Sequence, residues 1–143
     1  MKRIITIIFI LLMLFSFTGN CFAATSAGGG TEIAPCYVAT RSHTESFNIS
    51  SSGVATMNVA LAPFNTSTID EVKATLVIKN SSGTNVYNKT HNLPWNSLYA
   101  SFKTIKEHQL TKKGVYSFQV TYKCYKNGSL VETIKSTSIL KSY

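Results

Sequence analysis

Apolar and polar residues alternate along most of the chain beyond residue 36. Valine, isoleucine, threonine, tyrosine and phenylalanine take every second position in short runs, and each run ends at glycine, asparagine, serine or proline. This period of two is typical of strands with one buried face. We expect about eight such strands, at residues 37–41, 46–50, 54–62, 71–79, 85–92, 98–105, 115–125 and 130–140.

The clearest predicted hairpin lies near the C-terminus. Residues 115–125 alternate strictly, and Asn127-Gly128 then predicts a tight turn into residues 130–140. Residues 105–110 admit one turn of helix, and no other part of this region has helical periodicity. Seven or eight short strands without a helical crossover predict an all-β fold, a single antiparallel β-sandwich, with a small closed barrel as the alternative.

The first 23 residues follow another pattern. Lys2 and Arg3 precede a nearly unbroken apolar run at residues 4–17, and Cys21-Phe22-Ala23 supplies the small residues of a signal-peptidase site. We therefore expect residues 1–23 to be a hydrophobic signal helix that is cleaved between Ala23 and Ala24. The expected destination of the protein is outside the cell.

Two alternatives would keep the protein on a membrane. The apolar run of 14 residues is shorter than the roughly 17–25 residues that a spanning helix needs, so an uncleaved anchor is the less favoured interpretation. Lipidation of Cys21 is the other, although Asn20 stands where a lipoprotein signal requires a small residue. Cleavage leaves no transmembrane segment in the mature chain.

The mature chain divides into a short leader and one domain. Residues 24–34 include Gly28-Gly29-Gly30 and have little to bury, so we expect a flexible leader. Residues 35–143 form the predicted β-sandwich domain. Its two cysteines, Cys36 and Cys124, invite a disulfide in an oxidising compartment, which would stabilise the fold by about 4–5 kcal/mol. Two unpaired thiols are the alternative.

The charge balance favours anionic partners. The chain has 14 basic and 6 acidic residues, and loss of Lys2 and Arg3 leaves 12 against 6, a net charge of +6. An anionic cell-wall polymer, an acidic glycan or a membrane surface fits this charge, and nucleic acid is not specifically indicated. The competing interpretation is that single lysines along the strands are solvated residues that discourage aggregation.

A dozen residues resemble a known architecture. Leu110, Gly114, Tyr116, Phe118 and Val120 resemble the corner that enters the sixth strand of immunoglobulin-like and fibronectin-type sandwiches. The resemblance implies that the Tyr116 hydroxyl bonds back to the preceding loop. Phe118 stands where immunoglobulin domains have their second core cysteine, so the resemblance implies a sandwich without that disulfide.

The whole chain also resembles small, mostly uncharacterised single-domain proteins exported by low-GC Gram-positive bacteria. This second resemblance rests on the signal, the length and the composition, which is rich in lysine, asparagine, serine and threonine. It implies a location and no activity.

No motif for catalysis, metal binding or nucleotide binding is present in the mature sequence. His43, His91 and His108 are far apart and are interpreted as surface or turn residues. The carboxylates are few and spread out, and Cys124 on the inner face of a strand would be a poor nucleophile. We expect no cofactor, no metal and no enzymatic activity.

Trp95 is the best single candidate for a ligand contact. It follows Leu93-Pro94 in a predicted loop, where an aromatic ring either contacts a ligand such as a sugar or covers one end of the sandwich. The expected function is binding at the cell surface, to an anionic or glycan ligand. Edge-strand pairing in an assembly, through residues 37–50 or 130–140, is the alternative, and a small hydrolase or toxin-like factor is a third.

Overall fold

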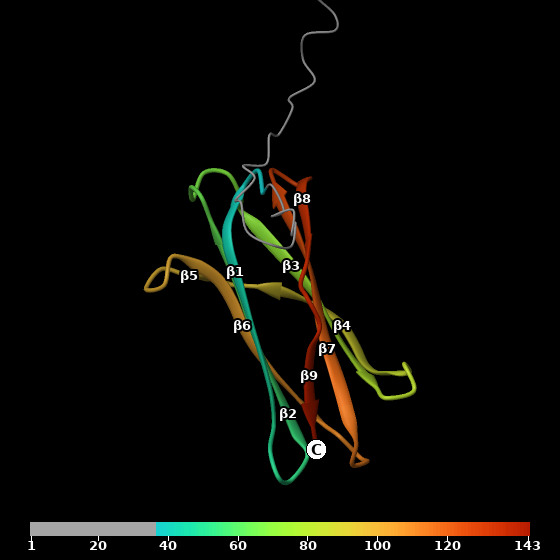
Figure 1. Cartoon of the computed structure of the whole chain (residues 1–143). Helices are drawn as coiled ribbons and strands as arrows, with labels where there is room; N and C mark the ends of the chain where they lie inside the picture. Colours follow the sequence, from blue (N-terminus) through green and yellow to red (C-terminus); the bar gives the residue numbers. More distant parts are fainter. Residues whose placement is uncertain (1–36) are drawn as a thin grey trace, which may run out of the picture. The chain divides into compact units, whose positions relative to one another are not determined.

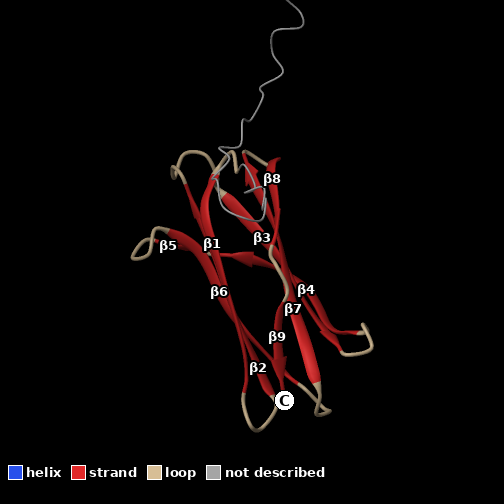
Figure 2. Ribbon diagram, in the orientation of Figure 1, coloured by secondary structure: helices blue, strands red, loops and turns tan. Residues whose placement is uncertain are grey.

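Two antiparallel sheets face each other in the computed structural model, which describes residues Tyr37–Tyr143. Sheet A has the order β1-β2-β6-β5 and sheet B the order β4-β3-β7-β8, with β9 also paired to β7 (Figure 1). This part of the chain contains strands and connecting loops but no helix (Figure 2). The strands are β1 (Thr40–Ile49), β2 (Val54–Pro63), β3 (Glu71–Asn80), β4 (Asn85–Leu93), β5 (Trp95–Asn96), β6 (Ser101–Gln109), β7 (Val115–Lys126), β8 (Ser129–Lys135) and β9 (Ile139–Ser142).

The predicted all-β fold with two packed antiparallel sheets is confirmed for the described residues. The signal helix at residues 1–23, its cleavage site and the leader at residues 24–34 lie outside them, as does Cys36. The strand order, four strands against four with β9 added, is compatible with the immunoglobulin-like resemblance.

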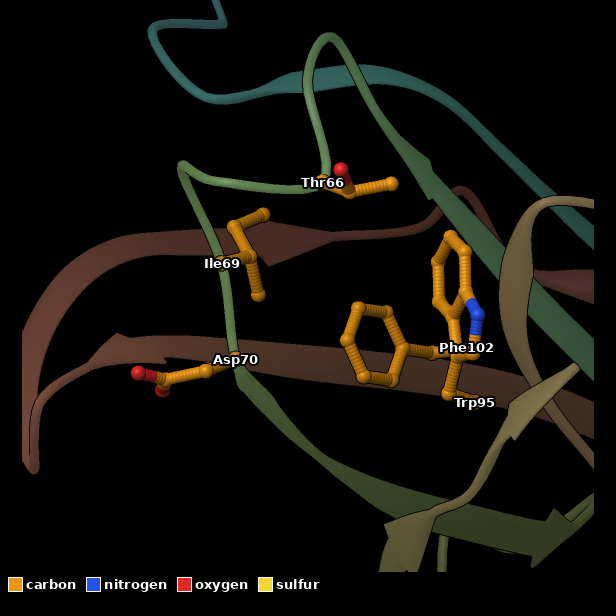
Figure 3. Close-up of a pocket in the computed structure, with 5 residues that line it drawn as sticks. All are labelled: Thr66, Ile69, Asp70, Trp95 and Phe102. Atoms are coloured by element: carbon orange, nitrogen blue, oxygen red, sulfur yellow. The ribbon is translucent and has the colours of Figure 1, made fainter. Parts of the chain in front are cut away.

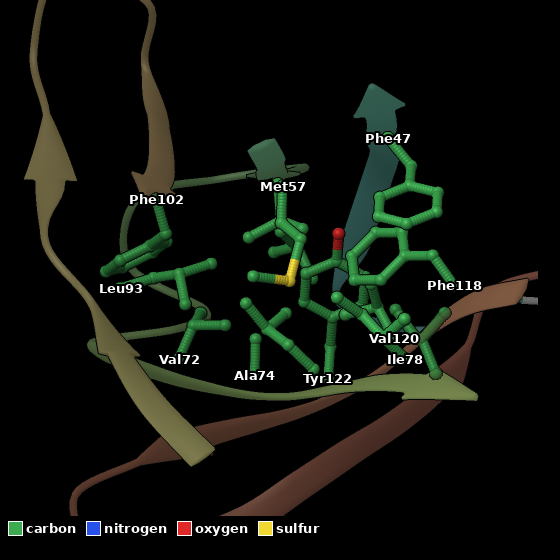
Figure 4. Close-up of a cluster of buried hydrophobic side chains, with 14 of the residues drawn as sticks. Phe47, Met57, Val72, Ala74, Ile78, Leu93, Phe102, Phe118, Val120 and Tyr122 are labelled. Atoms are coloured by element: carbon green, nitrogen blue, oxygen red, sulfur yellow. The ribbon is translucent and has the colours of Figure 1, made fainter. Parts of the chain in front are cut away.

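The core forms where the alternating faces of the two sheets meet. Met57 of β2 and Leu76 of β3 are fully buried, and Phe47 of β1 stacks on Phe118 of β7 with ring centroids 5.1 Å apart. Figure 4 shows Phe47, Met57 and Phe118 among the side chains that fill the space between the layers. Burial of each large apolar side chain stabilises the fold by about 1.5–3 kcal/mol, so this core is the main source of stability.

Three departures change the strand count from the expected eight to nine. The two opening strands are one continuous strand, β1, because the polar residues His43 and Glu45 turn inward instead of ending it. Trp95 and Asn96, predicted to interrupt pairing, form the short strand β5 against β6. The predicted strand at residues 130–140 is divided into β8 and β9.

Ser136 explains the division of the last predicted strand. Its side chain is buried and its Oγ accepts a hydrogen bond from the Val120 amide at 2.9 Å. The Ser136 amide in turn donates to the Val120 carbonyl at 2.9 Å. A serine hydroxyl therefore replaces one rung of the backbone ladder, and the chain leaves β7 before rejoining it as β9.

The prediction of a helical turn at residues 105–110 is wrong. β6 continues as a strand to Gln109 and pairs with β2 along its length, with Lys106 opposite Met57 and His108 opposite Ala55. These two polar residues lie on the inward side of β6 and interrupt the apolar alternation on which the strand prediction relied.

Two turns show why particular residues are needed. The hairpin between β7 and β8 has Asn127 at φ 50° and Gly128 at φ 75°, the two positive angles that a tight hairpin turn requires. Gly53, at φ 83°, lies in the turn between β1 and β2, where an added Cβ would approach the Tyr143 ring to 2.6 Å.

The corner between β6 and β7 is built around one tyrosine. Tyr116 is buried, and its hydroxyl donates a 2.6 Å hydrogen bond to the Lys112 carbonyl, four residues upstream. Leu110 packs in the core, and its amide donates to the Gly53 carbonyl at 2.9 Å. The Gly114 amide donates to the Tyr143 carbonyl at 3.2 Å, which joins the corner to the last residue of the chain.

Candidate functional site

Trp95 lies over a pocket at one end of the sandwich. Its ring is 40% exposed and meets Phe102 edge-on, with centroids 5.0 Å apart. Together with Thr66 and Ile69 from the loop between β2 and β3, the two rings line a cavity of about 410 Å³ (Figure 3). Trp95 therefore packs on Phe102 at this end of the sandwich and leaves part of its surface exposed.

The pocket offers little polar chemistry. Its one charged residue, Asp70, directs its carboxylate away from the two rings in Figure 3. One oxygen, Oδ2, accepts a 2.8 Å hydrogen bond from the Asn127 amide and lies 3.6 Å from Lys126 Nζ. Because Asp70 already holds the β7–β8 turn, the pocket suits an apolar group better than an anion. Ligand contact by Trp95 stays a prediction.

The outer face of sheet B is basic. Its outward positions include four lysines and one glutamate, a balance of +3, with threonines between them. We call this surface the lysine face. Its lysines and threonines are Lys73, Lys79, Lys123, Lys135, Thr75, Thr90, Thr121 and Thr133.

Two of these lysines stand directly opposite each other on neighbouring strands, Lys73 on β3 and Lys123 on β7. Like charges in this arrangement destabilise a sheet. Lys73 is partly neutralised, since its Nζ lies 3.3 Å from Glu71 Oε1 and 4.9 Å from the centroid of the Tyr125 ring. No ion pair of Lys79, Lys123 or Lys135 occurs among residues 37–143, so these charges are available to an external anion.

A polar network connects the two sheets beside β1. Glu45 Oε1 accepts hydrogen bonds from the Tyr122 hydroxyl at 2.7 Å and from His43 Nδ1 at 2.8 Å. His43 Nε2 lies 2.9 Å from the Tyr37 hydroxyl. Both ring nitrogens of His43 are therefore engaged within the fold, one by Glu45 and the other by Tyr37.

Two nucleophile candidates in this region are unreactive for the same reason. Burial raises the pKa of Cys124 to about 11, and a thiol in that state is protonated at neutral pH. Burial, and then the charge of Glu45, raises the pKa of the Tyr122 hydroxyl above its ordinary value. Thr40 Oγ1, 3.9 Å from Cys124 Sγ, is the nearest polar contact of the thiol within the described chain.

The histidines are not surface or turn residues, which corrects the sequence interpretation. All three lie on strands with half-buried side chains. His91 Nε2 lies 2.7 Å from the Tyr87 hydroxyl, and the His108 ring centroid lies 5.1 Å from that of Tyr87. Within residues 37–143 no group of three or more His, Cys, Asp or Glu residues could hold a metal ion.

A second cavity, of about 290 Å³, lies on the outer face of sheet A and contains residues that the sequence did not single out as a site. Arg41, Tyr99 and Lys103 contribute its charged and aromatic side chains. These residues are separated by up to 62 positions in the chain. No motif could have joined them, because only the pairing of β1, β2 and β6 brings them together.

Comparison with known proteins identifies no family for this chain. The sequence matches no protein-family model and no curated protein. None of the described residues belongs to a helix long and apolar enough to span a membrane.

Proposed function

We propose that this protein is an exported, non-catalytic binding domain that holds an anionic polymer or glycan of the cell surface. The observation that carries the proposal is the lysine face, where Lys73 and Lys123 are directly opposite each other and Lys79 and Lys135 extend the charge. A flat sheet with spaced cations and hydroxyls suits a polymer with repeated anionic groups better than a compact ligand. Export rests on the signal peptide predicted at residues 1–23.

We further propose that the fold is an immunoglobulin-like, fibronectin-type sandwich. The strand order of the two sheets and the hydrogen bond from Tyr116 to the Lys112 carbonyl support this assignment. In such a sandwich the paired strands fix the backbone positions from which the lysines extend before a ligand arrives. Less ordering is then required on binding, which favours affinity.

The edges of the sheets favour a binding domain over an assembly subunit. The edge strands β1, β4 and β8, and the part of β6 beyond its pairing with β5, each place an ionisable residue opposite a fully buried residue of the neighbouring strand. Inward-pointing charges of this kind discourage the addition of another strand. The residues are Glu45 on β1, Lys89 on β4, Lys106 on β6 and Glu132 on β8.

The test measures binding of the purified protein to immobilised polygalacturonate and polyphosphate over a salt series, with neutral dextran as the reference. The variant K123Q/K135Q removes two charges from the lysine face, and K113Q/K141Q removes the same charge elsewhere. We expect the first variant to bind about fivefold more weakly and with a shallower salt dependence. Equal weakening by both variants, or binding to dextran, would overturn the proposal.

A further inference from the structure

The cavity on the outer face of sheet A has the features of a built binding site. It is a groove across three strands, in which Ser42 of β1 pairs with Ala62 of β2 and Ala60 pairs with Lys103 of β6. We call it the Arg41 groove. Its lining residues are Arg41, Ser42, Thr44, Ala60, Ala62, Tyr99, Ser101 and Lys103.

Two backbone irregularities place the functional groups of the groove. The β1–β2 register shifts between Thr40 and Ser42, which makes Arg41 the extra residue of a bulge. Ala100 has φ 45°, in the left-handed region that non-glycine residues rarely occupy, and it follows Tyr99 in the turn between β5 and β6. This turn projects beyond the sheet in Figure 1. Bulges and strained residues of this kind are concentrated at binding sites.

Small side chains form the base of the groove, and larger side chains lie beside it. Ala60 and Ala62 occupy successive outward positions of β2, where alanine is uncommon because it fills little space on a sheet. The Tyr99 side chain is 60% exposed, and Lys103 Nζ lies 4.5 Å from the centroid of its ring. A ligand can therefore rest on the alanines with the tyrosine and the two cations beside it.

The charge of the groove is uncompensated. No carboxylate lines it, and neither Arg41 nor Lys103 forms an ion pair within the described part of the chain. Glu107 is on the same face of β6, but its Cα is four residues further along the strand, about 13 Å from that of Lys103. Two cations near an open aromatic ring and three hydroxyls are suited to an anionic, hydroxylated ligand.

We propose that the Arg41 groove binds one sugar residue that carries an anionic group. The Arg41 guanidinium and the Lys103 ammonium hold the anion, since the planar guanidinium matches a carboxylate or phosphate with two parallel hydrogen bonds. The Tyr99 ring contacts the sugar ring, and the Ser42, Thr44 and Ser101 hydroxyls contact its hydroxyl groups. The volume of about 290 Å³ is at the small end of ligand sites and accommodates one sugar unit.

This inference rests on the proposed function and adds a ligand class to it. The lysine face lies on sheet B and attracts a polymer by charge, whereas the Arg41 groove lies on sheet A and selects a unit of it. Because the two surfaces belong to different sheets, each can be removed without altering the other.

The test is an NMR titration of the full chain, isotopically labelled, with glucuronate, glucose 6-phosphate and glucose, and with acetate and inorganic phosphate as anions without a sugar. We expect glucuronate or glucose 6-phosphate to shift the amides of Ser42, Ala100 and Lys103 with a dissociation constant of about 1 mM. Whichever of the two binds more tightly identifies the anionic group as carboxylate or phosphate.

Variants locate the binding. Arg41→Gln and Tyr99→Ala should each weaken it by about tenfold, Tyr99→Phe should retain it, and Ala60→Leu should block the groove. The matched control is Asn58→Leu, which lies one outward position further along β2. Well-dispersed spectra show that each variant is folded.

Four results would overturn the proposal. They are the absence of amide shifts at about 20 mM ligand, glucose binding as tightly as the anionic sugars, acetate or phosphate binding as tightly as these sugars, and Asn58→Leu weakening the binding as much as Ala60→Leu. The variant K123Q/K135Q separates the two proposals. If this variant loses polymer binding but its groove amides still shift when the anionic sugar is added, both proposals are supported. If these amide shifts are lost in the variant, the groove is not a separate binding site and the proposal is refuted.

Discussion

The hydrogen bond between Tyr122 and Glu45 gives a quantitative test of how the two sheets are joined. Tyr122 of β7 is fully buried, and its hydroxyl donates at 2.7 Å to a carboxylate on β1 in the other sheet. The Glu45 side chain is only 11% exposed. A hydrogen bond to a charged group in such a place contributes about 1.5–3 kcal/mol.

Tyr122→Phe should lower the free energy of unfolding by this amount. The ring stays in place, so the cavity left behind is the size of one oxygen atom, and Glu45 keeps its hydrogen bond from His43. The loss is therefore the hydrogen bond itself. Urea unfolding, followed by circular dichroism, should show a midpoint lower by about 1–2 M, because the slope for a domain of this size is about 1.5 kcal/mol/M.

Two further variants make the test specific. In a Glu45→Gln background the acceptor is neutral, so Tyr122→Phe should cost only about 0.5–1.5 kcal/mol. Tyr125→Phe removes a hydroxyl from the outer face of the same strand and should change stability by less than about 0.5 kcal/mol. If Tyr122→Phe matched Tyr125→Phe, the buried network would add nothing and the reasoning would be refuted.

Three other predictions concern pH, backbone strain and thiols. Burial and nearby lysines lower the pKa of His91 below 6.5, so as the pH falls the unfolded chain is protonated at this histidine before the folded chain is. The free energy of unfolding should therefore decrease as the pH drops through 6.5. His91→Gln should reduce the change in the urea midpoint between pH 7.5 and 5.5. A positive slope unchanged by that variant would contradict this. Gly53→Ala should destabilise by about 1 kcal/mol more than Gly83→Ala in the same assay, since both have positive φ but only Gly53 faces a ring. The structure has Cys124 as a free thiol, and the disulfide to Cys36 stays a prediction from the sequence. Thiol titration of the mature chain in denaturant without reductant should recover no thiol if the two cysteines are bridged, and recovery of both thiols would exclude the disulfide.

Much of the fold could be predicted because alternation along a strand reports directly which face is buried. β3 and β7 followed this rule at almost every position. The prediction was wrong where polar residues turn inward, as at His43 in β1 and His108 in β6. The aromatic rings beside them, Tyr122 for His43 and Tyr87 for His108, come from strands further away in the sequence. Local pattern alone cannot show that such a residue is satisfied.

The two candidate sites also differ in whether the sequence could predict them. Trp95 was singled out because a large ring in a loop has no local explanation, and the structure places it over a pocket. The Arg41 groove gave no such signal, since its cations are ordinary strand residues in the sequence. What makes them a site is strand register together with a bulge, and both are properties of paired strands.

Strand β2 serves two purposes on alternate residues. Met57, Val59 and Leu61 face the core, while Ala60 and Ala62 face outward into the Arg41 groove. Substitutions at the outward positions reshape the groove and leave the packing between the sheets untouched. If the groove binds a sugar as proposed, ligand preference can change at these positions at little cost in stability, and the two outward alanines are the first to vary when engineering a new specificity.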